Sequence, residues 1–266
     1  MRVCTVLAVF LAVLLSGCAT VPETGRRQVM LLSPNQEAAM GLSAFAEIKK
    51  DEKISRDPVA NARVQRVGKR IAQSVGRDLP NAEWEFVVFE SNALNAFALP
   101  GGKVGIYTGI LKIAETDAEL AAVMGHEVAH VTSRHGAERT SQQLLVLGGA
   151  LLTEVGMEAK EVDEKKRNLI RAAYGLGASV GVMLPYSRLH ESEADAIGLR
   201  FAAGAGYDPR AAVSFWRKMS AASKGGMKVP EFLSTHPADQ TRIRNLEQLI
   251  PQYLPLYEQS RARFQD

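Results

Sequence analysis

The sequence is poor in cysteine, in long apolar runs and in charge of one sign. Its 266 residues contain two cysteines, which excludes a framework of several disulfides. No uninterrupted apolar run reaches the roughly 20 residues that a membrane-spanning helix needs. The 32 basic and 29 acidic residues leave a formal charge of +3 without a dominant basic block, so nothing favours nucleic-acid binding. The chain also lacks internal repeats and low-complexity segments.

What is present is ordinary for a globular protein. Hydrophobic residues make up 46% of the chain and charged residues 23%, enough to build a substantial core. We therefore expect a single globular domain over residues 33–266.

The first 18 residues differ from the rest. Arg2 is followed by an apolar run, 3–15, that has the proportions of a signal peptide, and Leu15-Ser16-Gly17-Cys18 resembles the lipobox of bacterial lipoproteins. We expect residues 1–17 to be removed, Cys18 to carry acyl chains, and residues 18–32 to form a tether. Ala19 after the cysteine favours the outer membrane. The alternative is a plain secretory signal with an incidental cysteine.

Helices and strands are predicted by caps and by hydrophobic period. A proline at position 34 and Asp57-Pro58 open two helices, the first ending near residue 53. Alternation from Glu83 to Thr108 predicts a small, mostly antiparallel sheet of about three strands. Further helices are expected at 187–203, 209–222 and 238–262. The fold class is therefore α+β and mostly helical.

The segment from Ala137 to Met183 is rich in Leu, Ala, Gly and Val, with charges clustered in its middle. Its apolar stretches are too short to span a membrane. We expect buried helices here. The alternative is a lid or a hairpin that leans on a membrane.

Residues 126–130 read His-Glu-Val-Ala-His, the most informative stretch of the chain. On a helix, His126 and His130 share one face, so both imidazoles can bind one zinc ion with Glu127 beside it. A capping box of Thr116 and Glu119 predicts where this helix begins. The pattern is that of a zinc peptidase site.

A catalytic zinc site normally needs a third protein ligand. Position 136, where metzincins place a third histidine, is Gly136, and His135 falls on the opposite side of the helix as a surface or capping residue. Glu191 on a later helix can supply the ligand, and Asp195, one turn on, can hydrogen-bond a ligating imidazole. On spacing alone, these two acidic residues can equally form an exposed helix face.

Several motifs in a fixed order resemble the HtpX, CAAX-prenyl-protease and Oma-like zinc metallopeptidases, peptidase family M48. They are Thr24-Gly25-Arg26-Arg27-Gln28, Asn95 to Gly102, the His-Glu-x-x-His motif, Leu184 to Arg188, Glu191-x-x-x-Asp195 and Ser234-Thr235-His236-Pro237. The layout is similar to that of small periplasmic lipoproteins such as LoiP and YcaL. The resemblance implies a zincin-like (gluzincin) fold and Glu191 as the third zinc ligand.

The family resemblance also implies a mechanism. Zinc lowers the pKa of a bound water towards about 7, and Glu127 takes its proton as the water attacks a peptide carbonyl. Candidates to stabilise the anionic intermediate are, in order, His236, Arg188 and Tyr186. His236 has a second possible role, because its imidazole could take the position of the water and hold the enzyme latent; it could also be an ordinary turn histidine.

The resemblance further implies a substrate platform, in which an edge strand pairs with an extended peptide. Its residues are Asn95, Ala96, Phe97, Gly101, Gly102 and Val104. An ordinary buried hairpin is the alternative for the strand that begins at Val104. Expected partners are unfolded or misfolded polypeptides, the membrane through the lipid on Cys18, and outer-membrane assembly machinery or other envelope proteases.

We therefore expect a zinc endopeptidase that faces the periplasm and degrades misfolded envelope proteins. The rival from another class is a chaperone-like or latent adaptor lipoprotein that binds zinc and unfolded clients but seldom cleaves.

Overall fold

The computed structural model of the chain describes residues 18–178, 184–224, 236 and 239–264, without the side chains of 18, 176–178, 184–186 and 223–224. The predicted signal peptide lies outside the described residues. The chain divides into two compact units, one from the N-terminal segment to Ser33 with Arg134–His190, the other from Pro34–Ser133 with Glu191 onward. Among the described residues, no helix has both the length and the apolarity to cross a bilayer.

The larger unit contains a three-stranded sheet of β3 (Glu85–Phe89), β4 (Ala96–Leu99) and β5 (Lys103–Tyr107) in the order β3-β5-β4. The three predicted strands are present, but the sheet is mixed rather than mostly antiparallel. The turn at Gly101-Gly102, with both φ angles positive, returns the chain antiparallel from β4 to β5. β3 pairs with the other side of β5, and in parallel.

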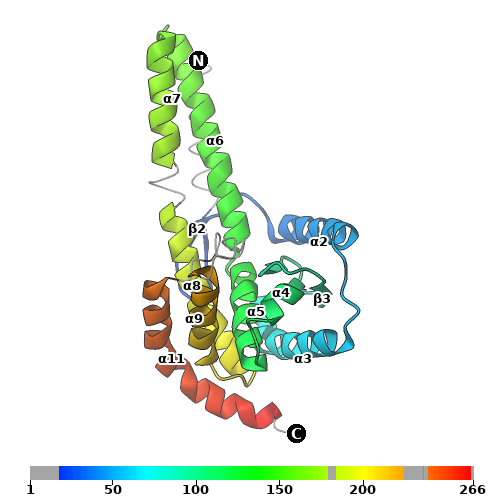
Figure 1. Ribbon diagram of the computed structural model, residues 1–266. Coiled ribbons are helices and arrows are strands. Elements are labelled where there is room, and N and C mark those ends of the chain that lie inside the picture. Colours follow the sequence, from blue (N-terminus) through cyan, green and yellow to red (C-terminus); the bar gives the residue numbers. More distant parts are fainter. Residues whose placement is uncertain (1–17, 179–183, 225–235, 237–238, 265–266) are drawn as a thin grey trace. The chain divides into compact units, whose positions relative to one another are not determined.

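Helices surround this sheet (Figure 1). Those of the larger unit are α2 (Pro34–Asp51), α3 (Pro58–Val75), the short α4 (Thr108–Leu111), α5 (Asp117–Thr132), the C-terminal part of α8 (Leu184–Gly204), α9 (Ala211–Lys224) and α11 (Gln240–Arg261), with 3-10 turns at Gly76–Asp78 and Ala262–Phe264. The two predicted N-terminal helices are confirmed. Asp57 caps α3 as expected, accepting hydrogen bonds from the amides of Val59 and Ala60.

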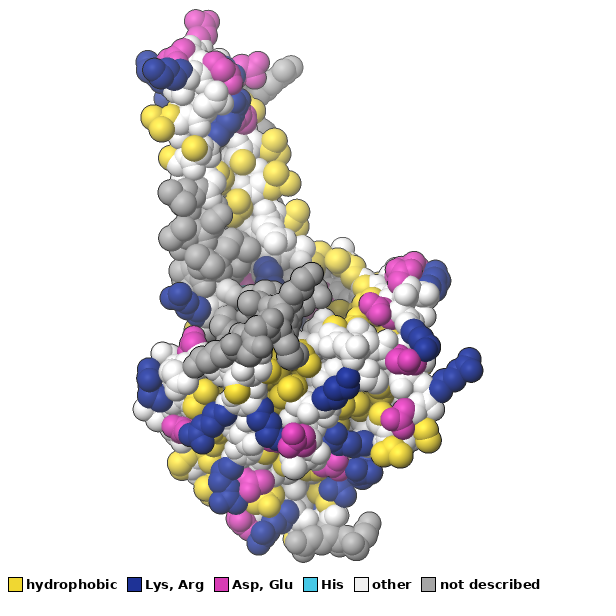
Figure 2. Space-filling view, in the orientation of Figure 1, with side chains coloured by type: hydrophobic (Ala, Val, Ile, Leu, Met, Phe, Trp, Pro, Cys, Tyr) yellow, Lys and Arg dark blue, Asp and Glu magenta, His cyan; other side chains and the backbone are white. Residues whose placement is uncertain are grey.

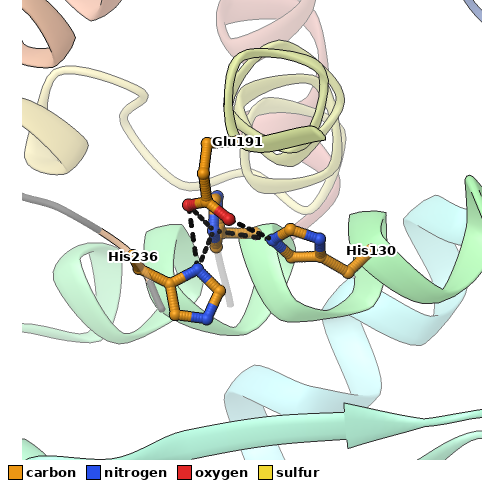
Figure 3. A group of neighbouring side chains, drawn as sticks. His130, Glu191 and His236 are labelled. Carbon is orange, nitrogen blue, oxygen red and sulfur yellow. Dashed lines mark hydrogen bonds and ion pairs between the residues drawn. The ribbon is translucent and has the colours of Figure 1, made fainter. Parts of the chain in front are cut away.

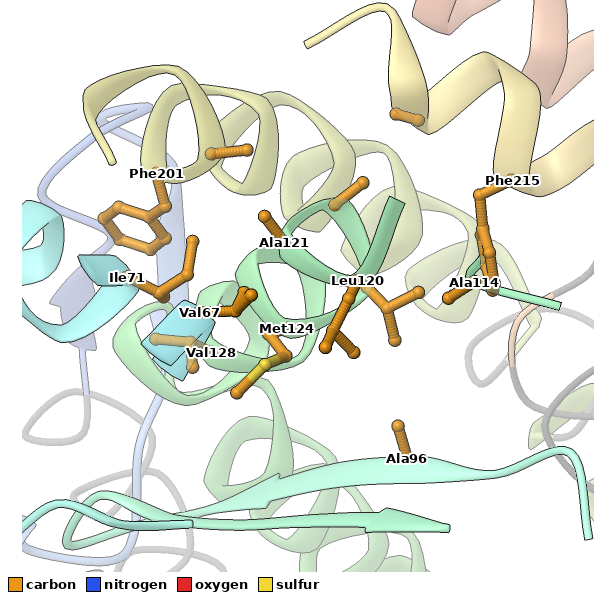
Figure 4. Close-up of a cluster of buried hydrophobic side chains, with 14 of the residues drawn as sticks. Val67, Ile71, Ala96, Ala114, Leu120, Ala121, Met124, Val128, Phe201 and Phe215 are labelled. Atoms are coloured by element: carbon orange, nitrogen blue, oxygen red, sulfur yellow. The ribbon is translucent and has the colours of Figure 1, made fainter. Parts of the chain in front are cut away.

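The core of the larger unit is built around α5, which is buried along most of its length. Figure 4 shows Leu120, Met124 and Val128 of this helix among side chains from neighbouring helices, with Ile71 of α3 and Phe201 of α8 close by. The sheet closes the other side, where β4 is the strand that packs on α5. The central helix is therefore held from several directions at once.

The smaller unit begins with a hairpin of β1 (Cys18–Thr20) and β2 (Arg27–Val29), followed by α6 (His135–Ala159), α7 (Glu164–Ala178) and the start of α8. The segment expected to be a tether thus contains ordered structure. Helices α6 and α7 lie side by side and antiparallel (Figure 1). The expectation that they are buried was wrong in part, because several leucines of α6 are exposed.

A buried polar cluster joins the hairpin to the helices of this unit. The guanidinium of Arg26 donates two hydrogen bonds to Glu138, at 2.8 and 2.7 Å, and Nε2 of His190 lies 2.9 Å from the same carboxylate. His135 stacks on His190 and is 1% exposed, so the expectation of a surface histidine was wrong. Helix α5 ends at Thr132, Arg134 adopts a left-handed conformation, and His135 starts α6.

Candidate metal centre

Helix α5 places the two motif histidines on one face. Its capping box is complete: Thr116 accepts from the amide of Glu119, whose carboxylate accepts from the amide of Thr116. One turn separates His126 from His130, and their Nε2 atoms lie 3.1 Å apart. Both imidazoles therefore converge on one point, as the spacing predicted.

The third residue of the cluster comes from α8. The carboxylate of Glu191 reaches both imidazoles, with oxygens 3.3 Å from Nε2 of His126 and 3.2 Å from Nε2 of His130. This is the position predicted for the third ligand.

His236 completes the cluster (Figure 3). Its Nδ1 lies 3.1 Å from Nε2 of His126 and 2.9 Å from a carboxylate oxygen of Glu191. Among the described residues, these four form the one group whose donor atoms could hold a metal ion. Ligands at 2.0–2.1 Å in a tetrahedron around zinc are about 3.3 Å from each other. The donor types and their separations therefore fit zinc.

Asp195 and Arg242 contact the residues of this cluster and hold them in place. Asp195 Oδ1 lies 3.0 Å from Nδ1 of His126, the nitrogen that faces away from the cluster. Arg242, on α11, donates to both carboxylate oxygens of Asp195, at 2.6 and 2.9 Å, and its Nη1 lies 3.1 Å from Glu191. Its guanidinium stacks 3.5 Å from the ring centroid of Trp216. All these side chains are buried, which fixes the orientation of the His126 imidazole.

The electrostatic field of the site favours a cation. Burial and the guanidinium of Arg242 act to lower the pKa of His126, yet the carboxylates of Asp195 and Glu191 outweigh them and raise it to about 9. Burial acts to raise the pKa of Glu191, but hydrogen bonds from the three histidines hold it far below its ordinary value. Surroundings that stabilise a protonated imidazole also stabilise a divalent metal ion at its place.

Glu127 stands beside the cluster and is 5% exposed. Burial raises the pKa of its carboxyl above the ordinary value, and positive charge on His236 and His126 opposes this. Its Oε1 lies 3.6 Å from Nε2 of His236 and accepts no hydrogen bond from the described residues. A buried acceptor with a raised pKa is well suited to take a proton from a molecule that enters the site.

Comparison with known proteins agrees with the arrangement of these side chains. The model of peptidase family M48 matches residues 58–250, most of the described chain. The chain belongs to peptidase family M48.

Relatives of this M48 chain come from mitochondria and from bacteria. It is 34% identical over 235 residues to the mitochondrial metalloendopeptidase OMA1 of Schizosaccharomyces pombe, covering 87% of this chain and 66% of that protein. It is 25% identical over 245 residues to the beta-barrel assembly-enhancing protease of Escherichia coli, covering 92% and 50%. The chain thus spans between about half and two thirds of these two relatives.

The predicted substrate platform of this M48 chain needs one correction. Val104 lies in β5, the central strand, which is paired on both sides and buried, so it cannot offer an edge to a peptide. Of the two edge strands, β3 and β4, it is β4 that contains Ala96 and Phe97 and follows Asn95. Gly101 and Gly102 form the turn after it. The alternative of a buried hairpin strand was right for Val104.

The remaining predicted residues are not among those gathered at the metal centre. Arg188 lies on α8 with an exposed side chain. Tyr186 is on the same helix, and its side chain lies outside the description, as does that of Cys18 in β1. Their predicted roles stay predictions.

Sequence reasoning missed Arg242 and Trp216. The signal for Arg242 was its place on the helix that follows the His236-Pro237 motif, where an arginine among polar residues looks like any solvated charge. Trp216 carried no local signal beyond the apolar face of its helix.

Proposed function

We propose that the chain is a zinc-dependent endopeptidase. The observation that carries this proposal is the convergence of His126, His130 and Glu191 within 3.3 Å of one another, with the buried carboxyl of Glu127 beside them. Three protein ligands and an adjacent carboxylate are the composition of a peptidase zinc site.

In this proposal, His126, His130 and Glu191 would hold the ion. Zinc bound there would polarise the scissile carbonyl and bring a water molecule to ionise near neutral pH. Glu127 takes the proton of the attacking water and later delivers a proton to the leaving amine. Its raised pKa supports this role, because a general acid-base works best when its pKa approaches the working pH.

His236 decides between an active and a latent state. With Nδ1 2.9 Å from Glu191 and 3.1 Å from His126, it occupies the fourth corner of the cluster, the place a water would need. This supports a resting form in which His236 blocks the metal. If it moves aside, its imidazole is still close enough to the site to stabilise the anionic intermediate.

The substrates we propose are extended, unfolded polypeptides. The edge strand β4 packs on α5, the helix that carries the two histidines, so a peptide added to this edge would run beside the site. Pairing through the backbone asks little of side chains and favours broad specificity. Together with the E. coli relative named for beta-barrel assembly, this supports quality control of misfolded envelope proteins by a lipid-anchored, periplasm-facing enzyme.

The second candidate function is a latent adaptor that holds zinc and unfolded clients but seldom cleaves. The position of His236 at the fourth corner is the observation that favours it.

The experiment that separates the two candidates is cleavage of unfolded casein by the chain from residue 18 onward, beside Glu127→Gln, with zinc measured on the same samples. Chelator-sensitive cleavage by the parent alone, with about one zinc in each protein, supports the peptidase. Zinc in every protein and cleavage by neither the parent nor His236→Ala would overturn it in favour of the adaptor.

A further inference from the structure

An apolar stripe runs along the exposed side of α6. Leu144, Leu147, Leu151 and Val155 are 47%, 58%, 61% and 50% exposed. Their spacing of three or four residues places them on one face of the helix. Figure 2 shows hydrophobic side chains along the shaft of the α6–α7 hairpin and charged ones at its tip. Four large apolar side chains in one row exceed the scattered exposure that any surface shows.

The neighbouring helix does not cover this stripe. Helix α7 packs on another face of α6, where the hydroxyl of Tyr174 donates to the carbonyl of Val146 at 2.8 Å. The same hydroxyl lies against Gly149, whose missing side chain makes room for it. The α6–α7 contact and the stripe therefore occupy different faces of one helix.

The stripe lacks charged residues that could fix the alignment of α6 against a helix of another chain. Between Arg139 and Glu154, the sequence contains no charged residue. Paired helices of two protein chains are normally aligned by charges that flank the apolar seam. A lipid surface needs no such alignment, so this composition favours lipid over a second copy of the chain.

The stripe belongs to the same compact unit as the N-terminal strand that starts at Cys18. Cys18 itself is the proposed lipid attachment point. A lipid there would bring this unit to a bilayer.

We propose that the face of α6 formed by Leu144, Leu147, Leu151 and Val155 inserts into a lipid surface. The inference rests on the membrane anchoring in the proposed function. The stripe covers eleven residue steps, about 17 Å at 1.5 Å each, which is shorter than the roughly 30 Å hydrocarbon core. The helix therefore lies in the plane of the membrane interface and adds apolar contact to the lipid anchor.

The test uses the chain from residue 18 onward with Cys18→Ser, so that no lipid is attached, and flotation with phosphatidylcholine vesicles. The parent is expected to bind. Leu147→Gln with Leu151→Gln is expected to weaken partitioning at least tenfold, because two half-exposed leucines lose their transfer into lipid. The matched control is Leu42→Gln with Val59→Gln, which changes two exposed residues of α2 and α3 and is expected to bind like the parent.

Binding through apolar contact should not change when salt is raised or when phosphatidylglycerol is added. A parent that fails to float, or that floats only with anionic vesicles at low salt, overturns the proposal. So does a stripe variant that floats normally but changes the oligomeric state in sedimentation, since the occupant is then a second copy.

A second variant tests insertion without introducing a polar residue that could unfold the protein. Leu147→Trp keeps the apolar character, and its fluorescence is expected to shift to the blue on adding vesicles, whereas Leu42→Trp stays unchanged; equal behaviour of the two argues against insertion. Cleavage of soluble casein by each variant separates the two inferences. A parent that cleaves casein but does not bind vesicles refutes the stripe alone, whereas a parent that binds vesicles while neither it nor His236→Ala cleaves casein refutes the peptidase.

Discussion

Gly125 and Gly198 face each other where α5 and α8 cross. A Cβ on Gly198 would lie 2.8 Å from the backbone nitrogen of His126, and one on Gly125 would lie 2.8 Å from the carbonyl oxygen of Gly198. Both distances are too short for real atoms. The absence of two side chains thus allows α8 to approach α5, so that Glu191 and Asp195 reach the imidazoles one to two turns away.

We expect Gly198→Ala to lower zinc affinity at least tenfold. The new methyl group meets backbone atoms of His126 and must push the helices apart, which moves Glu191 away from the imidazoles. Chelator competition measures the affinity. The matched control is Gly156→Ala on α6, where a Cβ would meet nothing within 4 Å and alanine favours the helix by up to about 1 kcal/mol. Unchanged zinc affinity in Gly198→Ala would show that the crossing does not set the ligand geometry.

Replacing Arg242 by glutamine is expected to weaken zinc binding by roughly 10- to 100-fold, the usual cost of losing a residue that orients a ligand. The substitution removes both hydrogen bonds to Asp195, which then no longer fixes the imidazole of His126. Titration calorimetry on the metal-free protein measures the effect. Arg244→Gln, two residues along the same helix and exposed, is the control and should bind like the parent. Equal losses in both variants would contradict the positioning role.

His236→Ala has opposite expected results for its two roles. If the imidazole blocks the fourth position, casein cleavage should rise severalfold and zinc content should remain, because three ligands are left. If it stabilises the intermediate, cleavage should fall by roughly 10²- to 10³-fold with little change in KM. Turnover measured beside Glu127→Gln decides between them, and the same rate as the parent would dispose of both roles.

Acid should weaken the start of α5. Burial acts to raise the pKa of Glu119, but hydrogen bonds from Lys218, Ser214 and the Thr116 amide outweigh it and lower the pKa below its ordinary value. A carboxyl with a lowered folded-state pKa stabilises the fold above its unfolded-state pKa, about 4.5, and loses this contribution as the pH falls through the folded-state value.

Glu119→Gln should therefore unfold more easily at pH 7, by about 1 kcal/mol, and should approach the parent below pH 4. Urea unfolding at several pH values measures this. Glu115→Gln, which also loses a contact to Lys218 but from an exposed carboxylate, should change stability by less than about 0.5 kcal/mol. A constant difference between parent and Glu119→Gln across this range would contradict the linkage.

Removing the guanidinium of Arg26 takes a positive charge and two hydrogen bonds away from the buried carboxylate of Glu138. We expect Arg26→Gln to destabilise the protein by about 3 kcal/mol, which thermal unfolding would show. Arg27 is the neighbouring exposed arginine, and Arg27→Gln should have no measurable effect. Similar melting temperatures for the two variants would argue against a structural role of the buried pair.

Local signals predicted the parts of the fold that depend on local interactions. The capping box at Thr116 and Glu119 predicted the start of α5, and the cap and apolar period of α3 predicted that helix. Both signals depend on residues three or four positions apart. The spacing of Glu191 and Asp195 placed both on one face of a helix. It did not show whether this face meets the histidines or the solvent. Only the family resemblance predicted Glu191 as the third zinc ligand.

What depends on distant pairing was not predictable in this way. The order of three strands follows from which edge of β5 receives β3, and no local residue encodes it. His135 was misplaced because its side was judged from the helix of His126, whereas the left-handed Arg134 separates α5 from α6, and His135 stacks on His190. Arg242 was missed because its contacts with Asp195 on α8 and Trp216 on α9 form only when α11 packs on α9.

Helix α5, which carries His126 and His130, is buried on almost every side. Amide hydrogens of a helix surrounded by core exchange with solvent mainly through global unfolding, so those of His126 and His130 should be among the slowest in the chain. His236 stands outside any helix or strand and has no such protection. A metal ion held by this cluster would therefore be reached by solvent from the side of His236 without unfolding of α5.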